Sequence, residues 1–459
     1  MSARKCLYLL LSLVLSQSAA YAQVTVERER GGYTVRSSEK FDVSPGGDLK
    51  MDDLMGDVTI TGGNYSQAEI IQEMFFEADN ESEARRLFDD YAAKIKKMDN
   101  RIEVSGEGSL TPKAHGSARQ LYLMVLSHRG DMYATYQVYL PQSFNADVST
   151  SGGDVTLSTI KGRVEAETSG GDIDLNGVTG TVDAQTAGGD VTARNTDGET
   201  TLATAGGDIS LSDGRTGPYN LKTAGGDITV RGLKGDVRAS TSGGDVEARN
   251  VEGELDLHTS GGDITLEEVK GIDHRASTSG GDVEARGVAG NVDLRTAGGT
   301  VLASRIQGRV LGNTSGGDMD ISEITGDADI STSGGDLFLR DIRGRLVGET
   351  SGGDIRARVE RRGKLGGPIR LNTSGGEIEL RLPSDAQASI SARIRIEDSW
   401  DDYTVRSDFK LKISSDVEET GGRRGRRYEE IVATGDINGG GPLIELETVN
   451  GDIIISKGN

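Results

Sequence analysis

The 459-residue sequence has few of the residues that build a thick core or cross-link a small one. Only 4% of its residues are aromatic, it contains seven prolines, and its single cysteine is Cys6. One cysteine excludes an intramolecular disulfide framework. With so few aromatic side chains, the core must consist mainly of Val, Ile, Leu and Ala, and we expect it to be thin.

Long apolar runs are also missing, since none reaches the ~20 residues that cross a membrane as a helix. The run from Leu7 to Leu15 follows Arg4 and Lys5 and precedes Ala20-Tyr21-Ala22. This order is typical of a secretory signal peptide over residues 1–22. We therefore expect an exported protein without a transmembrane segment, located in the periplasm, on the outer surface or in the medium.

Basic residues are in short supply, with 51 Lys and Arg against 73 Asp and Glu, for a net charge of -22. Such an acidic chain is a poor partner for nucleic acid or anionic lipid. Hydrophobic residues make up only 34%, but 66 glycines restore an ordinary balance. The composition therefore indicates a folded, turn-rich protein instead of a disordered one.

The dominant feature is the phrase Thr-(Ser/Ala)-Gly-Gly-Asp-(Ile/Val), which recurs at intervals of 18 or 19 residues, with a last interval of 23. A fixed period of this size predicts stacked supersecondary units. The glycine pairs begin at Gly152, Gly170, Gly188, Gly206, Gly225, Gly243, Gly261, Gly280, Gly298, Gly316, Gly334, Gly352 and Gly375.

Within one period, apolar positions recur every nine residues, as Val164 and Ile173 do, and alternate with polar ones. Alternation with period 2 predicts short strands with one inward face. We expect each glycine pair to break a strand by adopting positive φ. The fold class is then all-β, a parallel β-solenoid of about 13 coils of about 18 residues, with two short strands per coil.

The flanks predict covers for the open ends of this array. We divide the chain into the signal peptide, an N-terminal α+β cap (23–145), the repeat array (146–382) and a C-terminal β cap (383–459). Asn80 and Glu83 are expected to cap a helix whose apolar face comprises Ala84, Leu87, Phe88, Tyr91, Ile95 and Met98. Further strands are expected at Ala68–Phe76, Gln120–Leu126, Met132–Leu140, Ser389–Ile396 and Tyr403–Ile413.

Three segments carry a family resemblance: Val138-Tyr139-Leu140-Pro141 before Ser151-Gly152-Gly153-Asp154-Val155, Leu380-Arg381-Leu382-Pro383 after the array, and GGGPLIELETVNGDIIISK near the end. With these segments the chain resembles the bacterial putative-adhesin family of β-strand-repeat domains of unknown function. The resemblance covers nearly the whole mature chain. It implies an exported β-solenoid with no known catalytic residues and raises the expectation of surface binding.

Eleven repeats place Asp directly after the glycine pair, while Thr300 and Glu377 fill the other two positions. Stacked carboxylates about 5 Å apart repel one another by about 1 kcal/mol in water. Either turn N–H groups and hydroxyls satisfy them, or Ca²⁺ lies between coils. The calcium candidates are Asp154, Asp172, Asp190, Asp208, Asp227, Asp245, Asp263, Asp282, Asp318, Asp336 and Asp354.

Two basic clusters stand out: Arg423, Arg424, Arg426 and Arg427, and Arg361, Arg362 and Lys364. They are either solvated turns or anion-binding candidates for an anionic glycan or a lipopolysaccharide phosphate, which guanidinium groups suit. The four histidines occupy unrelated repeat positions, which predicts exposed or capping roles: His115, His128, His258 and His274.

No acid, base and nucleophile converge where the repeat is broken, at Asp213–Pro218, Thr300 and Glu360–Pro368, and GxSxG is absent. We therefore expect a non-catalytic cell-envelope protein without a required cofactor, acting as a scaffold or an adhesive surface for a glycan or a protein. A calcium-stabilised structural module and a polysaccharide-active β-helix enzyme are the alternatives.

Overall fold

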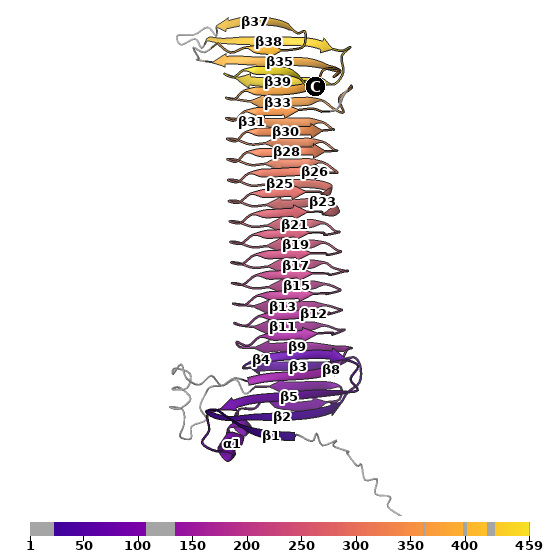
Figure 1. Ribbon diagram of the computed structural model, residues 1–459, viewed down its shortest axis with the longest axis vertical. Helices are drawn as coiled ribbons and strands as arrows, with labels where there is room; N and C mark the ends of the chain where they lie inside the picture. The colour runs from indigo at the N-terminus through magenta and orange to yellow at the C-terminus, as the bar shows by residue number, and fades with distance from the viewer. Residues whose placement is uncertain (1–22, 107–133, 361–362, 398–401, 420–426, 459) are drawn as a thin grey trace, which may run out of the picture.

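Two long, facing β-sheets form a single rod, with α1 (Glu81–Tyr91) near the N-terminal end. This computed structural model describes residues 23–106, 134–360, 363–397, 402–419 and 427–458. The C-terminal strands lie at the opposite end (Figure 1). No helix in these ranges is long and apolar enough to cross a membrane.

Each coil of the array contributes one short strand to each sheet, and neighbouring coils pair in parallel with equivalent positions opposite each other, as Val164 and Val182 are. Sheet A contains β10 (Val155–Ser158), β12 (Ile173–Asn176), β14 (Val191–Arg194), β16 (Ile209–Ser212), β18 (Ile228–Arg231), β20 (Val246–Arg249), β22 (Ile264–Glu267), β24 (Val283–Arg286), β26 (Val301–Ile306), β28 (Met319–Ile324), β30 (Leu337–Ile342), β32 (Ile355–Arg358) and β34 (Ile378–Pro383).

Sheet B repeats the same arrangement on the opposite side of the core. Its array strands are β9 (Phe144–Thr150), β11 (Val164–Thr168), β13 (Val182–Thr186), β15 (Thr200–Ala203), β17 (Tyr219–Lys222), β19 (Val237–Ser240), β21 (Leu255–His258), β23 (Lys270–Ser277), β25 (Ala289–Arg295), β27 (Val310–Asn313), β29 (Ala328–Ser331), β31 (Leu346–Thr350) and β33 (Ile369–Thr373). The predicted all-β architecture of stacked, parallel-paired short strands is confirmed.

A buried threonine before each glycine pair joins consecutive coils. Thr186 Oγ1 donates to the Gly171 carbonyl at 2.9 Å and accepts the Gly189 N–H at 3.3 Å. The donated bond recurs at fourteen threonines from Thr150 to Thr448. The two hydrogen bonds offset the cost of removing the hydroxyl from water, so each turn is held to the coil before it.

The glycine pairs have a different role from the one expected. None of them has positive φ, so that prediction is wrong. A Cβ on the second glycine, Gly189, would overlap the Gly171 carbonyl of the preceding coil, whereas a Cβ on Gly188 would meet its nearest atom at 3.6 Å. The second glycine is required by the close approach of successive turns. Positive φ occurs at another corner, for example at Gly177 and Asn195.

Two coils of the array have 19 residues, and each places an aromatic side chain in the inward column of sheet B. Tyr219 pairs with Thr200 and Val237, and its side chain is fully buried. His274 lies between Leu255 and Val292 in the same column and is 2% exposed. The expected exposed role of His274 is therefore wrong, because an irregularity between Lys270 and Asp273 shifts the phase of the strand and turns the imidazole inward. His258 is exposed, as predicted; His115 and His128 lie outside the described residues.

The N-terminal flank extends both sheets. Sheet A gains β1 (Gln23–Glu29), β2 (Gly32–Asp42), β5 (Gln67–Phe76), β8 (Ala134–Pro141) and β4 (Asp57–Gly63), and sheet B gains β6 (Lys94–Met98), β7 (Arg101–Ser105) and β3 (Gly47–Leu54). Strands β3 and β4 pair with β9 and β10, so they form a coil of the rod.

The expected N-terminal helix is present but shorter than predicted. Asn80 accepts the Glu83 N–H at 3.0 Å and so caps it. Ala84 and Phe88 are buried. Ile95 and Met98, expected on the helix face, lie instead in β6. The predicted strands at 68–76 and 132–140 correspond to β5 and β8, and the one at 120–126 lies outside the described residues.

The C-terminal flank contains β35 (Ala388–Glu397), β36 (Val405–Ser407), β37 (Lys412–Glu419), β38 (Arg427–Ile437), β39 (Leu443–Val449) and β40 (Ile453–Gly458). The strand predicted at 389–396 is confirmed, whereas 403–413 contains β36 and only the start of β37. Strand β39 lies between β33 and β35, and β40 lies between β34 and β36. The chain therefore steps over an inserted strand after each Leu-Pro pair, at Pro141 and at Pro383.

The glycine geometry predicts a large difference between two adjacent substitutions. Gly189→Ala should lower the free energy of unfolding by about 1–3 kcal/mol, because the methyl group overlaps backbone that cannot move away. Gly188→Ala should change it by less than about 0.5 kcal/mol. Urea unfolding followed by circular dichroism measures both. Equal effects of the two substitutions would contradict the role assigned to the second glycine.

Burial of His274 predicts that acid destabilises the rod. Among the described residues, neither ring nitrogen of His274 meets full hydrogen-bond geometry, although the Ala289 backbone lies near the imidazole. Burial lowers the pKa of the imidazole, against the opposing effects of the Ala289 backbone and the Asp273 carboxylate. Above about pH 6.5 the ring is neutral in both states. Below it, the unfolded chain binds a proton that the folded ring resists, so stability should fall with pH.

Thermal melts between pH 7.5 and 5 test this dependence. His274→Leu, which introduces the residue found at the same register in the preceding coil, should reduce the slope of melting temperature against pH. His258→Gln, at an exposed position, should leave the slope unchanged. If His274→Leu keeps the full slope, the imidazole is not its source.

Candidate binding surface

The Asp side chains after the glycine pairs form a hydrogen-bonded column along one corner of the rod. The Asp154 Oδ1 atom accepts the Asp172 N–H at 2.9 Å, and Asp172 Oδ1 accepts the Asp190 N–H at 2.8 Å. The same bond continues coil by coil to the N–H of Thr300. It resumes at Asp318 and ends at the N–H of Glu377. Each carboxylate therefore stabilises the backbone of the following turn.

The column extends beyond the repeats that define it in the sequence. Asp57 Oδ1 accepts the Asp154 N–H at 2.9 Å, and Asp452 Oδ1 accepts the Thr404 N–H at 2.7 Å. In the sequence, Asp57 and Asp452 could have been found from the Gly-Asp-(Val/Ile) triplets that contain them outside the array. Burial, together with the carboxylates of Glu379, Asp452 and Asp354, raises the pKa of Glu377, which shows how closely the acids are packed here.

Calcium binding by the column stays a prediction from the sequence. Within the described ranges, no three or more His, Cys, Asp or Glu side chains form a cluster that could hold a metal ion. Ca²⁺ prefers six to eight oxygen ligands, whereas one oxygen of each column carboxylate already accepts a backbone N–H. Thr300 interrupts the column because its side chain offers no carboxylate to the next coil.

Charge reverses in the last coils of the array. Residues 147–336 contain 15 Lys and Arg against 32 Asp and Glu, a net charge of -17. Residues 337–381 contain 10 Lys and Arg against 6 Asp and Glu, a net charge of +4. A basic segment on an acidic rod attracts anions locally, since charges beyond about 8 Å are screened at physiological salt.

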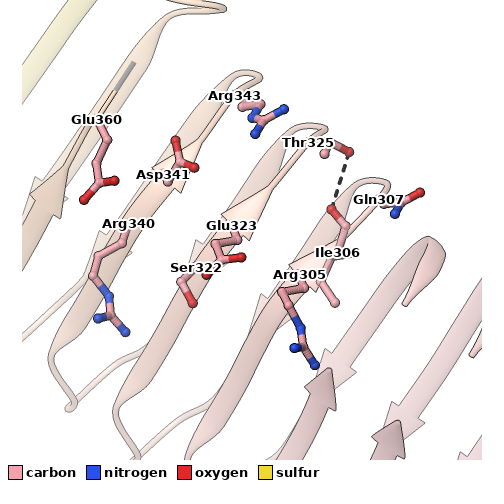
Figure 2. Close-up of a pocket in the computed structure, with 10 residues that line it drawn as sticks. All are labelled: Arg305, Ile306, Gln307, Ser322, Glu323, Thr325, Arg340, Asp341, Arg343 and Glu360. Carbon is pink, nitrogen blue, oxygen red and sulfur yellow. Dashed lines mark hydrogen bonds between the residues drawn. The ribbon is translucent and has the colours of Figure 1, made fainter. Parts of the chain in front are cut away.

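A polar hollow of about 420 Å³ lies at the edge of sheet A in the coils around this reversal (Figure 2). Ten residues line it: Arg305, Ile306, Gln307, Ser322, Glu323, Thr325, Arg340, Asp341, Arg343 and Glu360. Arg305 contacts Glu268 at 3.5 Å, and Arg340 contacts Asp320 at 2.9 Å. The side chains of Glu323, Asp341 and Arg343 make no ion pair or hydrogen bond within the described residues, so they are available to a ligand.

The backbone around this hollow is strained. Arg305, Glu323 and Asp341, on three successive coils, have φ values of 56°, 57° and 48°. Earlier coils place Gly or Asn at the equivalent corner, as at Gly232 and Asn250, or have a single strained residue, at Thr159, Asp213 and Glu268. A run of three on successive coils occurs in the described array only at this hollow. The left-handed region costs about 1 kcal/mol or more for such residues. Strain of this kind, next to unpaired charges, is a feature of functional sites.

A second hollow, of about 390 Å³, lies beside sheet B at the same end of the array. Its lining includes Val347, Pro368, Arg370 and Leu443, and Leu443 is 48% exposed. Glu360 borders the first hollow and Pro368 the second. Both therefore adjoin the 23-residue coil, whose insertion interrupts the repeat.

Apolar side chains on the outside of the rod also gather after Thr300. In the array strands of sheet A, the central outward positions before this point are Thr, Ser, Asp or Glu, but the later ones include Leu302 and Phe338. The equivalent positions of sheet B include Leu311 and Val347. The Arg356 guanidinium lies 5.6 Å from the centre of the Phe338 ring. Partly exposed apolar groups beside paired and unpaired charges are typical of a binding surface.

Most of the anion-binding candidates from the sequence lie outside the described residues: Arg423, Arg424, Arg426, Arg361 and Arg362. Arg427 is the first residue of β38. Lys364 lies within the Glu360–Pro368 loop, where it forms a β-bridge with Gln387. Of the basic residues at 337–381, the sequence analysis named only Arg361, Arg362 and Lys364. The others were missed, because they are spread over several coils and come together only through strand register.

The geometry defines a non-globular class of protein, a parallel β-solenoid of two sheets. The family model described as Toastrack DUF4097 matches residues 137–287 and 273–438, which together span about two thirds of the chain. The protein belongs to this family. The result agrees with the predicted resemblance to a family of repeat domains of unknown function.

Two solved structures resemble the chain more distantly. A putative cell adhesion protein from Clostridium sporogenes is 10% identical, with 96% of this chain and 100% of that chain covered and a TM-score of 0.15. A putative adhesin from Bacteroides fragilis is 13% identical, with 70% and 96% covered and a TM-score of 0.18. These TM-scores are too low to support an argument. No curated protein matches the chain.

The hydrogen bonds of the Asp column predict that calcium has little effect on stability. Thermal melts of the mature chain in excess calcium and in EDTA should coincide, because the N–H groups already satisfy the carboxylates. Asp227→Asn should also melt normally, since the amide oxygen can accept the Asp245 N–H. A melt raised by calcium in the parent and not in Asp227→Asn would establish a metal site instead.

Proposed function

We propose that this chain is an exported, non-catalytic cell-envelope protein whose last coils form an adhesive binding surface. The observation that carries the proposal is the coincidence, between Thr300 and Arg381, of two hollows, outward apolar side chains, backbone strain and a reversal of charge. The preceding coils lack this combination and serve as a regular spacer. Export rests on the signal peptide predicted at residues 1–22.

The acidic part of the rod suits the role of a spacer. Its outward columns are rich in Thr, Ser, Asp and Glu, which remain well hydrated. A net charge far from zero keeps such rods apart in solution. The basic, partly apolar coils lie toward the end opposite α1 (Figure 1). A rod built in this way holds its binding surface at a distance from its N-terminal end.

Binding of the mature chain to isolated bacterial cell-envelope fragments tests the proposal. We expect saturable binding that falls at least tenfold in the double variant Phe338→Thr/Val347→Thr, because these side chains supply the apolar contacts of the surface. Thr is found at equivalent outward positions elsewhere in the array, so the variant should fold. Thr201→Ser/Thr229→Ser, on the spacer, should bind like the parent.

Two results would contradict the proposal. One is the absence of binding to any envelope fraction by a parent protein that shows a normal β-type spectrum. The other is release of reducing sugar or unsaturated product from envelope polysaccharide, which would indicate the β-helix enzyme that the sequence left as an alternative.

A further inference from the structure

Three arginines lie side by side on the outer face of sheet A in the last coils. Arg340 is opposite Arg358, and Arg358 is opposite Arg381. We call these three residues the arginine ladder. Parallel strands are about 4.8 Å apart, so the ladder places positive charges in a row along the rod axis at that interval.

The ladder is the longest uninterrupted run of like charge in its column. Earlier members of the same column are Ser158, Asn176, Arg194, Ser212, Arg231, Arg249, Glu267, Arg286, Ser304 and Ser322. In the one other adjacent arginine pair, both guanidiniums contact Glu247. Like charges directly opposite each other destabilise a sheet. A run of three is therefore costly unless a ligand of opposite charge binds it.

The guanidiniums of the ladder are accessible. The side chains of Arg340 and Arg358 are 55% and 54% exposed and contact Asp320 and Glu360. Exposed ion pairs of this kind contribute little stability and exchange readily for other partners. Arg381 is exposed and has no ion pair or side-chain hydrogen bond within the described residues. Arg356 and Phe338 lie alongside, so the row has an aromatic ring beside it, whereas the Arg356 guanidinium is already paired with carboxylates.

We propose that the arginine ladder binds an acidic glycan, an extended polysaccharide with one carboxylate or phosphodiester group in each repeating unit. A row of evenly spaced guanidiniums matches a polymer with evenly spaced anions, whereas a single small anion would use only one or two of them. The Phe338 ring offers an apolar surface for a sugar ring. This inference rests on the proposed function, since it names the class of polymer that the adhesive surface would take.

Binding of the full mature chain to purified polymers tests the ladder. The probes are polygalacturonate for carboxylates, poly(glycerol phosphate) for phosphodiesters, neutral dextran, and a single-stranded oligonucleotide. We expect binding to at least one of the two acidic polymers and none to dextran. The polymer that binds identifies the anionic group. The triple variant R340S/R358S/R381S should bind at least tenfold more weakly, and the slope of log K against log salt should shrink by about 2, since each neutralised charge contributes about 0.7.

The spacer provides a matched control. R194S/R231S/R286S removes three arginines from the same column, with side chains 52–54% exposed and no two on neighbouring strands. Serine is native to this column, so both triple variants should fold, and neither should melt below the parent. The control should keep parent affinity and salt dependence. Equal losses in the two variants, or no loss in either, would overturn the ladder as the site.

Two further outcomes separate this inference from the proposed function. Parent-like binding of R340S/R358S/R381S to envelope fragments, without any binding of the parent to the acidic polymers, would overturn the ladder and leave the adhesive surface standing. Binding of the parent to acidic polymers but not to envelope fragments would overturn the proposed adhesive function and leave the ladder as an anion-binding site. Oligonucleotide binding as tight as polymer binding would overturn the glycan assignment in favour of a nucleic acid.

Discussion

The close approach of successive turns at the glycine pairs is the constraint on which the rod depends. The second glycine lies against the carbonyl of the preceding coil, and the buried threonine and the Asp carboxylate bond across the same step. These contacts repeat along nearly the whole length of the rod. Because each coil is positioned by the one before it, side chains about eighteen residues apart form straight columns. The chemistry of the outer faces follows from that alignment.

Because successive coils are in register, outward side chains at equivalent positions form continuous rows on the surface of the rod. A single outward arginine is a solvated residue with little effect, but three in register form a line of charge. The same holds for the Asp column: the aligned carboxylates would repel one another if the N–H groups of the next coil did not donate hydrogen bonds to them. The rod can therefore vary its outer columns coil by coil while the inner columns stay nearly constant.

The repeat period, the two strands per coil and the inward columns could be predicted, because they depend on local alternation of residues such as Val164 and Ala166. The role of Gly189 could not, since its steric limit comes from a carbonyl eighteen residues away. The burial of His274 depends on one irregular position that shifts the phase of β23. The insertion of β40 beside β34 joins residues 75 apart, Ile378 and Ile453, which no local pattern connects. The row of Arg340, Arg358 and Arg381 was missed for the same reason, because only strand register brings these residues together.

The inserted coils at the two ends of the array are each enclosed between the array and another part of the chain. Strands β39 and β40 are the last two of the fold in chain order, yet they lie between the array and β35 and β36, and β3 and β4 are enclosed in a similar way between β7, β8 and the array. Each end coil is thus covered on its outer side by a different part of the chain. A stack of coils that could otherwise fray one at a time is covered at both ends by segments that must leave before the coil beneath can open.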